Sequence, residues 1–161
     1  MSLLLAAALL AAPQKATDKL PPANPVPYTE QDTAAVLATV ETLLGAIGTH
    51  DPKAGASVVR PEGVLTAAKE NADGTRSVMR LTLGELVAAF ASGPAGASET
   101  MSDPAVEIDG DIAMVWAPFV FRINGQAHHC GVNHFDLLRE NGAWKIVTIT
   151  YSSRTTGCGA Q

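Results

Sequence analysis

Three short turn signals divide the C-terminal half of the chain and constrain its fold more than any other feature. The dipeptides Asp109-Gly110, Asn124-Gly125 and Asn141-Gly142 each favour a tight turn between two strands. Four long, mostly apolar segments lie around them: 98–108, 112–123, 127–139 and 143–153. Strands joined in succession by such turns form an antiparallel meander, so the sequence predicts four consecutive antiparallel strands.

The preceding part of the chain predicts a long helix and a second, shorter one. Apolar residues recur at spacings of three and four from Val36 to Ile47, which is typical of one face of a helix. Thr29 or Asp32 can cap its start. We expect the short helix over residues 53–58.

A hairpin and a third helix follow. The pair Asp73-Gly74 separates two short apolar segments and marks the hairpin. Thr82 and Glu85 have the spacing of a capping box and begin the third helix. Helices segregated to one side of an antiparallel sheet place the chain in the α+β class.

Composition limits both the number of domains and the class of partner. The chain has 161 residues, of which 47% are hydrophobic and 17% charged, so it is long enough for one folded domain. The net charge is -5 and there is no basic block, which argues against nucleic-acid binding through phosphate neutralisation. No phosphate loop or other cofactor motif is present, and we expect no cofactor.

The N-terminus predicts export. Residues 3–12 form an unbroken apolar run, too short to span a membrane and typical of the hydrophobic part of a signal peptide. Against this, no Lys or Arg precedes the run and Pro13 follows it, so the alternatives are a frayed terminal helix or a misassigned start codon. We interpret residues 1–16 as a signal peptide, 17–28 as a proline-rich linker and 29–158 as the domain. The expected location is periplasmic or secreted.

The C-terminal residues resemble those of a known superfamily. The run His129-Cys130-Gly131-Val132-Asn133, the later Gly142-Ala143-Trp144-Lys145-Ile146 and the final Gly157-Cys158 are similar to bacterial proteins described as lumazine-binding or SnoaL-like. These belong to the nuclear transport factor 2-like superfamily. The resemblance implies a cone-like, curved antiparallel sheet wrapped around three helices, with a pocket inside and often a dimer formed through the sheet. It implies little about chemistry, because the superfamily holds both enzymes and proteins that only bind.

The register expected from the turns divides the strands into two faces. Two-residue turns would pair Trp116 with Asn133 and Leu137 with Ile146, and side chains alternate between faces along each strand. The face that carries both tryptophans is assigned to the helices and the pocket. The predicted ligand-pocket residues are Met114, Trp116, His129, Asn133, Phe135, Trp144, Thr148 and Thr150. The other, convex face is still apolar and predicts a homodimer packed through the sheet.

Two histidines are the weak catalytic candidates. His129 lies among apolar neighbours on the predicted inner face, where it could act as a general base, and His50 follows the first helix. A metal site is not expected, because Cys130 and His134 would be about 13 Å apart along one strand. In an oxidising compartment, Cys130 and Cys158 could form a disulfide that holds the C-terminal tail. The alternative is two free thiols.

Three functions remain open at this stage. The first is binding of a small apolar or aromatic molecule in the inner pocket. The second is a small cofactor-independent isomerase, dehydratase or cyclase that uses a pocket histidine. The third is a dimerisation or interaction module whose core is filled by side chains such as Trp116, Phe135 and Trp144.

Overall fold

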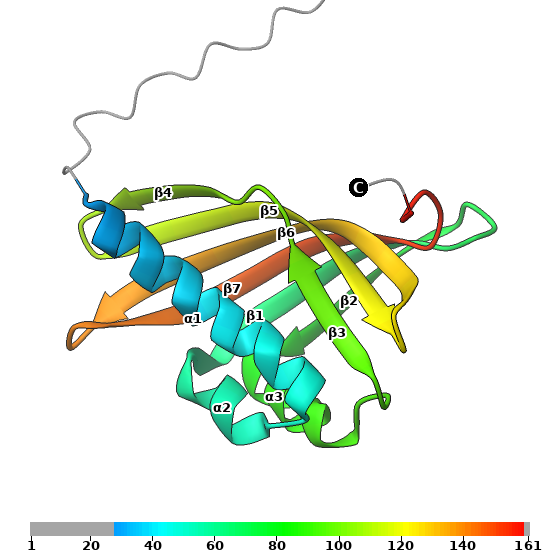
Figure 1. Ribbon diagram of the computed structural model, residues 1–161, viewed down its shortest axis with the longest axis horizontal. Coiled ribbons are helices and arrows are strands. Elements are labelled where there is room, and N and C mark those ends of the chain that lie inside the picture. Colours follow the sequence, from blue (N-terminus) through cyan, green and yellow to red (C-terminus); the bar gives the residue numbers. More distant parts are fainter. Residues whose placement is uncertain (1–27, 160–161) are drawn as a thin grey trace, which may run out of the picture.

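A curved sheet covers one long helix and two short ones (Figure 1). The computed structural model describes residues 28–159, so the predicted signal peptide and most of the linker lie outside the described residues. The helices are α1 (Glu30–Thr49), α2 (Pro52–Ser57) and α3 (Leu83–Ala89), the last followed by a 3-10 turn, η1 (Phe90–Ser92). The strands are β1 (Val59–Glu70), β2 (Arg76–Thr82), β3 (Ala97–Met101), β4 (Ala105–Asp109), β5 (Ile112–Ile123), β6 (Gln126–Glu140) and β7 (Ala143–Arg154).

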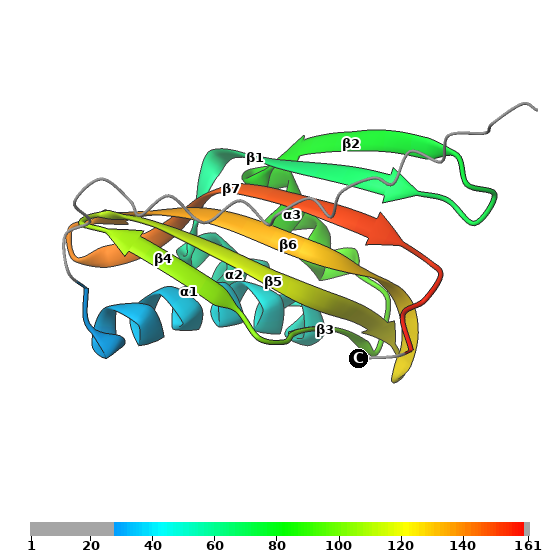
Figure 2. The ribbon, with the colours of Figure 1, turned by 90° about the horizontal axis from the view of Figure 1, so that it is seen from above.

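The sheet has the order β2-β1-β7-β6-β5-β3, and β4 also pairs with β5 (Figure 2). The antiparallel meander from β4 to β7 is confirmed, as is the α+β class. The sheet is nevertheless mixed rather than purely antiparallel, because β1 pairs with β7 in parallel. The expected single strand over 98–108 is wrong: Asp103, with φ of 43°, and Pro104 interrupt it, and both β3 and β4 pair with β5.

The helix ends follow the capping signals in the sequence. Thr29 is the N-cap of α1, and Asp32 completes a capping box by accepting from the Thr29 backbone N–H. Thr82 and Glu85 form the same arrangement at the start of α3. The apolar face of α1 is buried against the sheet through Val36, Val40, Leu43 and Leu44 and their neighbours in the core.

Arg139 of β6 ties the start of α1 to the sheet. Its guanidinium donates to Asp32 Oδ1 and to Asp111 Oδ1, both at 2.8 Å, and to the carbonyl of Gly110. The same group lies 4.8 Å from the ring centroid of Trp144, within the range of a cation–π contact. Side chains fill this end of the molecule, whereas a cavity remains toward the C-terminal end of α1.

Candidate functional site

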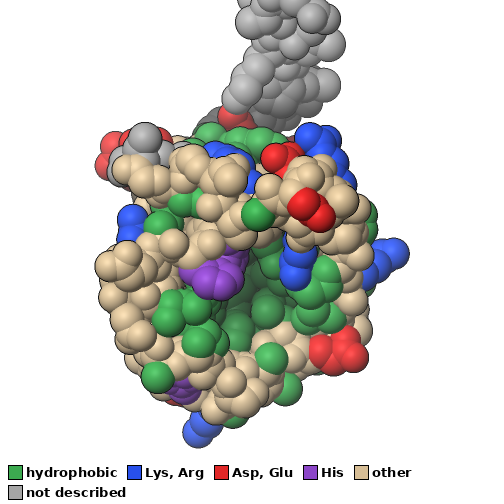
Figure 3. All heavy atoms as spheres, turned by 90° about the vertical axis from the view of Figure 1, so that its right-hand side faces the viewer, with side chains coloured by type: hydrophobic (Ala, Val, Ile, Leu, Met, Phe, Trp, Pro, Cys, Tyr) green, Lys and Arg blue, Asp and Glu red, His purple; other side chains and the backbone are tan. Residues whose placement is uncertain are grey.

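The inner face of the sheet and the helices enclose a cavity of about 290 Å³. Figure 3 shows its mouth as a hollow lined by hydrophobic side chains, with histidine at the rim. Most of the lining is apolar, which is typical of a small-molecule site. The lining residues come from α1 (Leu43, Leu44, Ile47), β1 (Leu65), the α3 region (Leu86, Ala89, Phe90, Gly93, Pro94) and strands β3 to β7 (Glu99, Phe121, His129, Asn133, Phe135, Ile149, Tyr151).

Glu99 of β3 is the main chemical feature of this cavity. Asn133 Nδ2 of β6 donates to Glu99 Oε1 at 2.7 Å. Protein surrounds most of the Glu99 side chain, and this desolvation raises the pKa of its carboxyl from 4.5 to about 7. The hydrogen bond from Asn133 acts in the opposite direction and lowers the pKa. The carboxyl therefore changes protonation state near neutral pH.

Sequence reasoning missed Glu99, although the pattern held a signal for it. Ala97, Glu99 and Met101 alternate along β3, so they share the inner face of the sheet. Ala97 is buried and Met101 packs against the core. A single carboxylate in an otherwise apolar row of a strand is the kind of position at which a buried ionisable group is expected.

His129 of β6, one of the two histidines considered from the sequence, lines the cavity. Desolvation lowers its pKa from 6.5 to about 4, and the nearby positive charges of His128 and Lys69 add to the effect. Its ring stacks on Phe121, with centroids 4.8 Å apart, and meets the edge of Phe119. The imidazole is therefore neutral at pH 7, which makes it a weak base and not a cation.

Tyr151 of β7 contributes the fourth polar group of the cavity. Burial raises the pKa of its phenol, and the nearby charge of Glu99 raises it further. The phenol is therefore protonated at neutral pH and can donate a hydrogen bond to a ligand. Together with Glu99, Asn133 and His129, it gives an apolar cavity a small set of convergent polar side chains.

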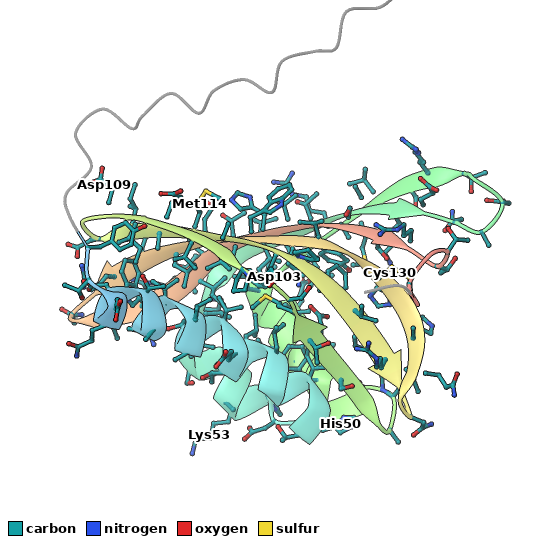
Figure 4. All side chains as sticks on the ribbon, turned by 45° about the horizontal axis from the view of Figure 1, so that its top comes forward. His50, Lys53, Asp103, Asp109, Met114 and Cys130 are labelled. Atoms are coloured by element: carbon teal, nitrogen blue, oxygen red, sulfur yellow. A yellow bond between two sulfur atoms is a disulfide. The ribbon has the colours of Figure 1, made fainter. Side chains whose placement is uncertain are left out.

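Three of the predicted pocket residues line the cavity: His129, Asn133 and Phe135. Met114 and Trp116 do not, and the cause is a β-bulge. His128 is the extra residue: the pairing shifts by one between Arg122 and Phe121, so Trp116 pairs with His134 instead of Asn133. As a result, Met114 and Trp116 lie on the face of the sheet opposite to the face of Asn133. Figure 4 shows Met114 on the side of the sheet away from the helices.

A second bulge displaces Thr148 and Thr150. Val147 is the extra residue here, so Asp136 pairs with Thr148, and Phe135 pairs with Ile149. Thr148 and Thr150 therefore face outward, while Ile149 and Tyr151 take the predicted inner positions and line the cavity. Trp144 is buried, but at the filled end of the molecule beside Arg139 and away from the cavity.

His50 has a structural position and does not line the cavity. It is the C-cap of α1 in the left-handed region, with φ of 53°. Its Nδ1 lies 3.0 Å from the carbonyl oxygen of Phe90, so it links the end of α1 to η1. It is therefore a poor candidate for the catalytic role considered from the sequence.

The disulfide between Cys130 and Cys158 is confirmed. Their Cα atoms are 5.5 Å apart, and Cys130 is fully buried near the start of β6 (Figure 4). Because of the bulge at Val147, Cys130 pairs with Arg154 of β7 rather than with Ser153, the partner that a register without bulges would give. The bridge fixes the chain after β7 and is typical of proteins that fold in an oxidising compartment.

The outer face of the sheet carries exposed apolar side chains. Ile112 and Trp116 are 56% and 51% exposed, and Leu138 lies near them. The ring of Trp116 contacts the ring of His134, and His134 Nε2 lies 3.4 Å from Asp136 Oδ1. Exposed apolar area of this kind is typical of an interface.

No helix within residues 28–159 combines the length and hydropathy that a membrane span requires. Over the same residues, no group of three His, Cys, Asp or Glu side chains is placed to hold a metal ion.

Comparison with known proteins finds similarity in structure but not in sequence. No family model matches the sequence, and no curated protein is significantly similar to it. A protein of unknown function from Nostoc punctiforme with a cystatin-like fold aligns at 12% identity over 81% of this chain and 97% of its own, with a TM-score of 0.63. A candidate dehydratase of the NTF2-like family from Streptomyces avermitilis aligns at 18% identity over 76% and 95%, with a TM-score of 0.59.

A third structure is the association domain of CaMKII from C. elegans. It aligns at 19% identity over 76% of this chain and 95% of its own, with a TM-score of 0.57. At these identities the likeness concerns the fold. The chain has the cone-like α+β fold of NTF2-like and cystatin-like proteins, as its C-terminal residues predicted.

Proposed function

We propose that the protein binds a small, mostly apolar or aromatic molecule in the inner cavity. The observation that carries this proposal is the cavity itself, about 290 Å³ in volume and apolar except for a few convergent polar groups. A fully packed interaction module would not leave such a space. The filled core expected from Trp116 and Trp144 is also not formed, because neither side chain lines the cavity.

A matched pair of alanines on α3 offers a direct test. Ala89 lines the cavity, whereas its neighbour Ala88 does not, and both are exposed. If the protein binds a small molecule, native mass spectrometry should detect an adduct on the wild type expressed with its leader. The adduct is either co-purified or acquired from a library of apolar compounds. The adduct is lost in Ala89→Trp and kept in Ala88→Trp. Equal loss or equal retention in both variants contradicts binding in this cavity.

The second candidate is a cofactor-independent isomerase, dehydratase or cyclase. Glu99 favours it, because a carboxyl with a pKa of about 7 exchanges a proton readily at neutral pH. This moves the acid–base role from His129 and His50 to Glu99. In this function Glu99→Gln abolishes turnover of a substrate that the wild type converts, and His129→Ala does not.

Export and dimerisation form part of the same proposal. The Cys130–Cys158 bridge supports a periplasmic or secreted location, since disulfides persist in oxidising compartments. The exposed apolar side chains of the outer face support a homodimer through the sheet. The likeness to an association domain is compatible with such a dimer.

A further inference from the structure

The lining of the main cavity is mostly apolar but contains one acidic side chain, Glu99. Glu99 is the one acidic side chain among the lining residues within 28–159, and no Lys or Arg lines the cavity. Its only hydrogen-bond partner in this part of the chain is Asn133, which donates to Oε1. A carboxylate offers about four acceptor sites on two oxygens, so capacity remains for a ligand.

A second cavity meets the first at Glu99. It has a volume of about 390 Å³ and lies between α1 and β3, with Glu99 and Leu44 common to both cavities. The exposed Glu41 of α1 also borders it, and its lining again includes no Lys or Arg. A ligand that approaches Glu99 from this side therefore passes a second carboxyl group and no cationic side chain of the lining.

The walls around Glu99 also favour a cation. Phe90, Phe121, Phe135 and Tyr151 line the main cavity, and aromatic faces attract ammonium groups through cation–π contacts. His129 is neutral at pH 7, so it does not repel a cation. An ionised carboxylate in such surroundings lacks a counter-charge, and leaving it uncompensated is costly.

We propose that the ligand is a small apolar amine whose protonated nitrogen pairs with Glu99 while its apolar part packs among the aromatic side chains of the cavity. This inference rests on the proposed binding function and names the chemical class of its ligand. An anionic ligand would face repulsion from Glu99, and a neutral ligand would leave the carboxylate without a counter-charge.

Besides His129, four other charged or titratable side chains lie near the cavity, and a test must distinguish their effect on binding from that of Glu99. Glu41 lies on α1, and Tyr151 on β7 is protonated at neutral pH. Lys69 of β1 and His128 of β6 act on His129. Because Lys69 would oppose a cation, Glu99 and Glu41 are the charged side chains among these that favour one, in addition to the aromatic rings.

The experiment compares three probes of one shape and different charge: 2-phenylethylamine, 2-phenylethanol and phenylacetate, titrated calorimetrically into the disulfide-bonded protein. At pH 8 we expect the amine to bind at least about tenfold more tightly than the alcohol, since the ammonium group adds an ion pair to its hydrogen bond with the carboxylate and the neutral hydroxyl does not. Phenylacetate should bind most weakly. Amine affinity should fall about tenfold between pH 8 and pH 5.5, as Glu99 takes up its proton.

Two variants assign the preference to one carboxyl. Glu99→Gln keeps the side-chain shape and should lose most of the amine preference, together with its pH dependence. Glu62→Gln, at an exposed position on β1 outside both cavities, should behave as the wild type. An undiminished preference or pH dependence in Glu99→Gln overturns the inference, because another group then causes it.

The outcomes also separate this inference from the binding function. Equal affinities of the wild type for amine and alcohol overturn the amine inference and leave a cavity that binds neutral molecules. If none of the three probes binds at millimolar concentration, and no compound of the apolar library binds, the binding function fails together with it.

Discussion

Asn133 and Glu99 join two strands that are not neighbours. Asn133 lies on β6 and Glu99 on β3, with β5 between them, yet the amide donates to the carboxyl at 2.7 Å. Both side chains lie on the inner face of the curved sheet and meet there, although Glu99 pairs with Phe121 of β5 and Asn133 pairs with Ala117. This contact places an ionisable group in the wall of an apolar cavity.

The buried carboxyl makes stability depend on pH. The pKa of Glu99 is about 7 in the folded protein, whereas a glutamate in the unfolded chain has the ordinary value of 4.5. The folded state therefore holds the proton more tightly than the unfolded chain. The stability contributed by protonated Glu99 is therefore present below pH 4.5 and lost as the pH rises to about 7. The loss should reach about 3 kcal/mol.

Urea unfolding at pH 5 and pH 8 measures this effect. Glu99→Gln lacks the titration, so its free energy of unfolding relative to the wild type should increase by about 2 to 3 kcal/mol between the two pH values. Glu62→Gln serves as the control and should show no such change. A difference between wild type and Glu99→Gln that does not vary with pH would contradict the burial of an ionisable carboxyl.

Asn133 should control the acidity of Glu99. Its hydrogen bond favours the ionised carboxyl, so Asn133→Ala should raise the pKa of Glu99 further. Carbon-13 NMR of the glutamate carboxyls, followed from pH 4 to 9, reads this pKa directly. An unchanged or lower value in the variant would show that the amide does not donate to Glu99 in solution.

The disulfide should contribute substantially to stability. It closes a loop with a sequence separation of 28, for which chain-entropy reasoning gives about 3 to 4 kcal/mol. Cys158→Ser should lose this amount, and it is preferable to a change at the buried Cys130, which would also disturb packing. Reductant should destabilise the wild type to the level of the variant and leave the variant unchanged. A wild type insensitive to reductant would mean that the bridge is not formed.

The outer face should hold the proposed dimer through Trp116. Trp116→Lys places a charge within the apolar patch and should convert the dimer to a monomer in light-scattering chromatography. Val78→Lys is the matched control, since Val78 is 74% exposed on β2, a strand at the edge of the sheet. A wild type that is monomeric, or a variant that stays dimeric, contradicts the interface.

The elements of the fold could be predicted because their signals are local. The glycine turns defined the strands from β5 to β7, and the capping signals at Thr29 or Asp32 and at Thr82 indicated the starts of two helices. The disulfide could also be predicted, because the short tail after β7 can bring Cys158 close to Cys130. The turns and helix caps depend on residues close together in the chain, whereas the disulfide joins two cysteines with a sequence separation of 28.

The composition of the cavity could be predicted only in part, because it depends on register over long strands. One extra residue at His128 and one at Val147 each reversed the faces beyond them, and neither bulge has a signal in the sequence. Trp116 and Thr148 thereby moved outward, and Tyr151 moved inward. Glu99 was missed because its partner, Asn133, is 34 residues away and two strands across the sheet.

The central claim, that the cavity binds a small molecule, is tested most directly by methyl NMR during titration with small aromatic compounds that include 2-phenylethylamine. The account predicts saturable shifts at methyl groups of the cavity lining, such as those of Leu44, Leu86 and Ile149. Shifts confined to Ile112 and Leu138 on the outer face, or no shifts at millimolar concentration, would contradict it.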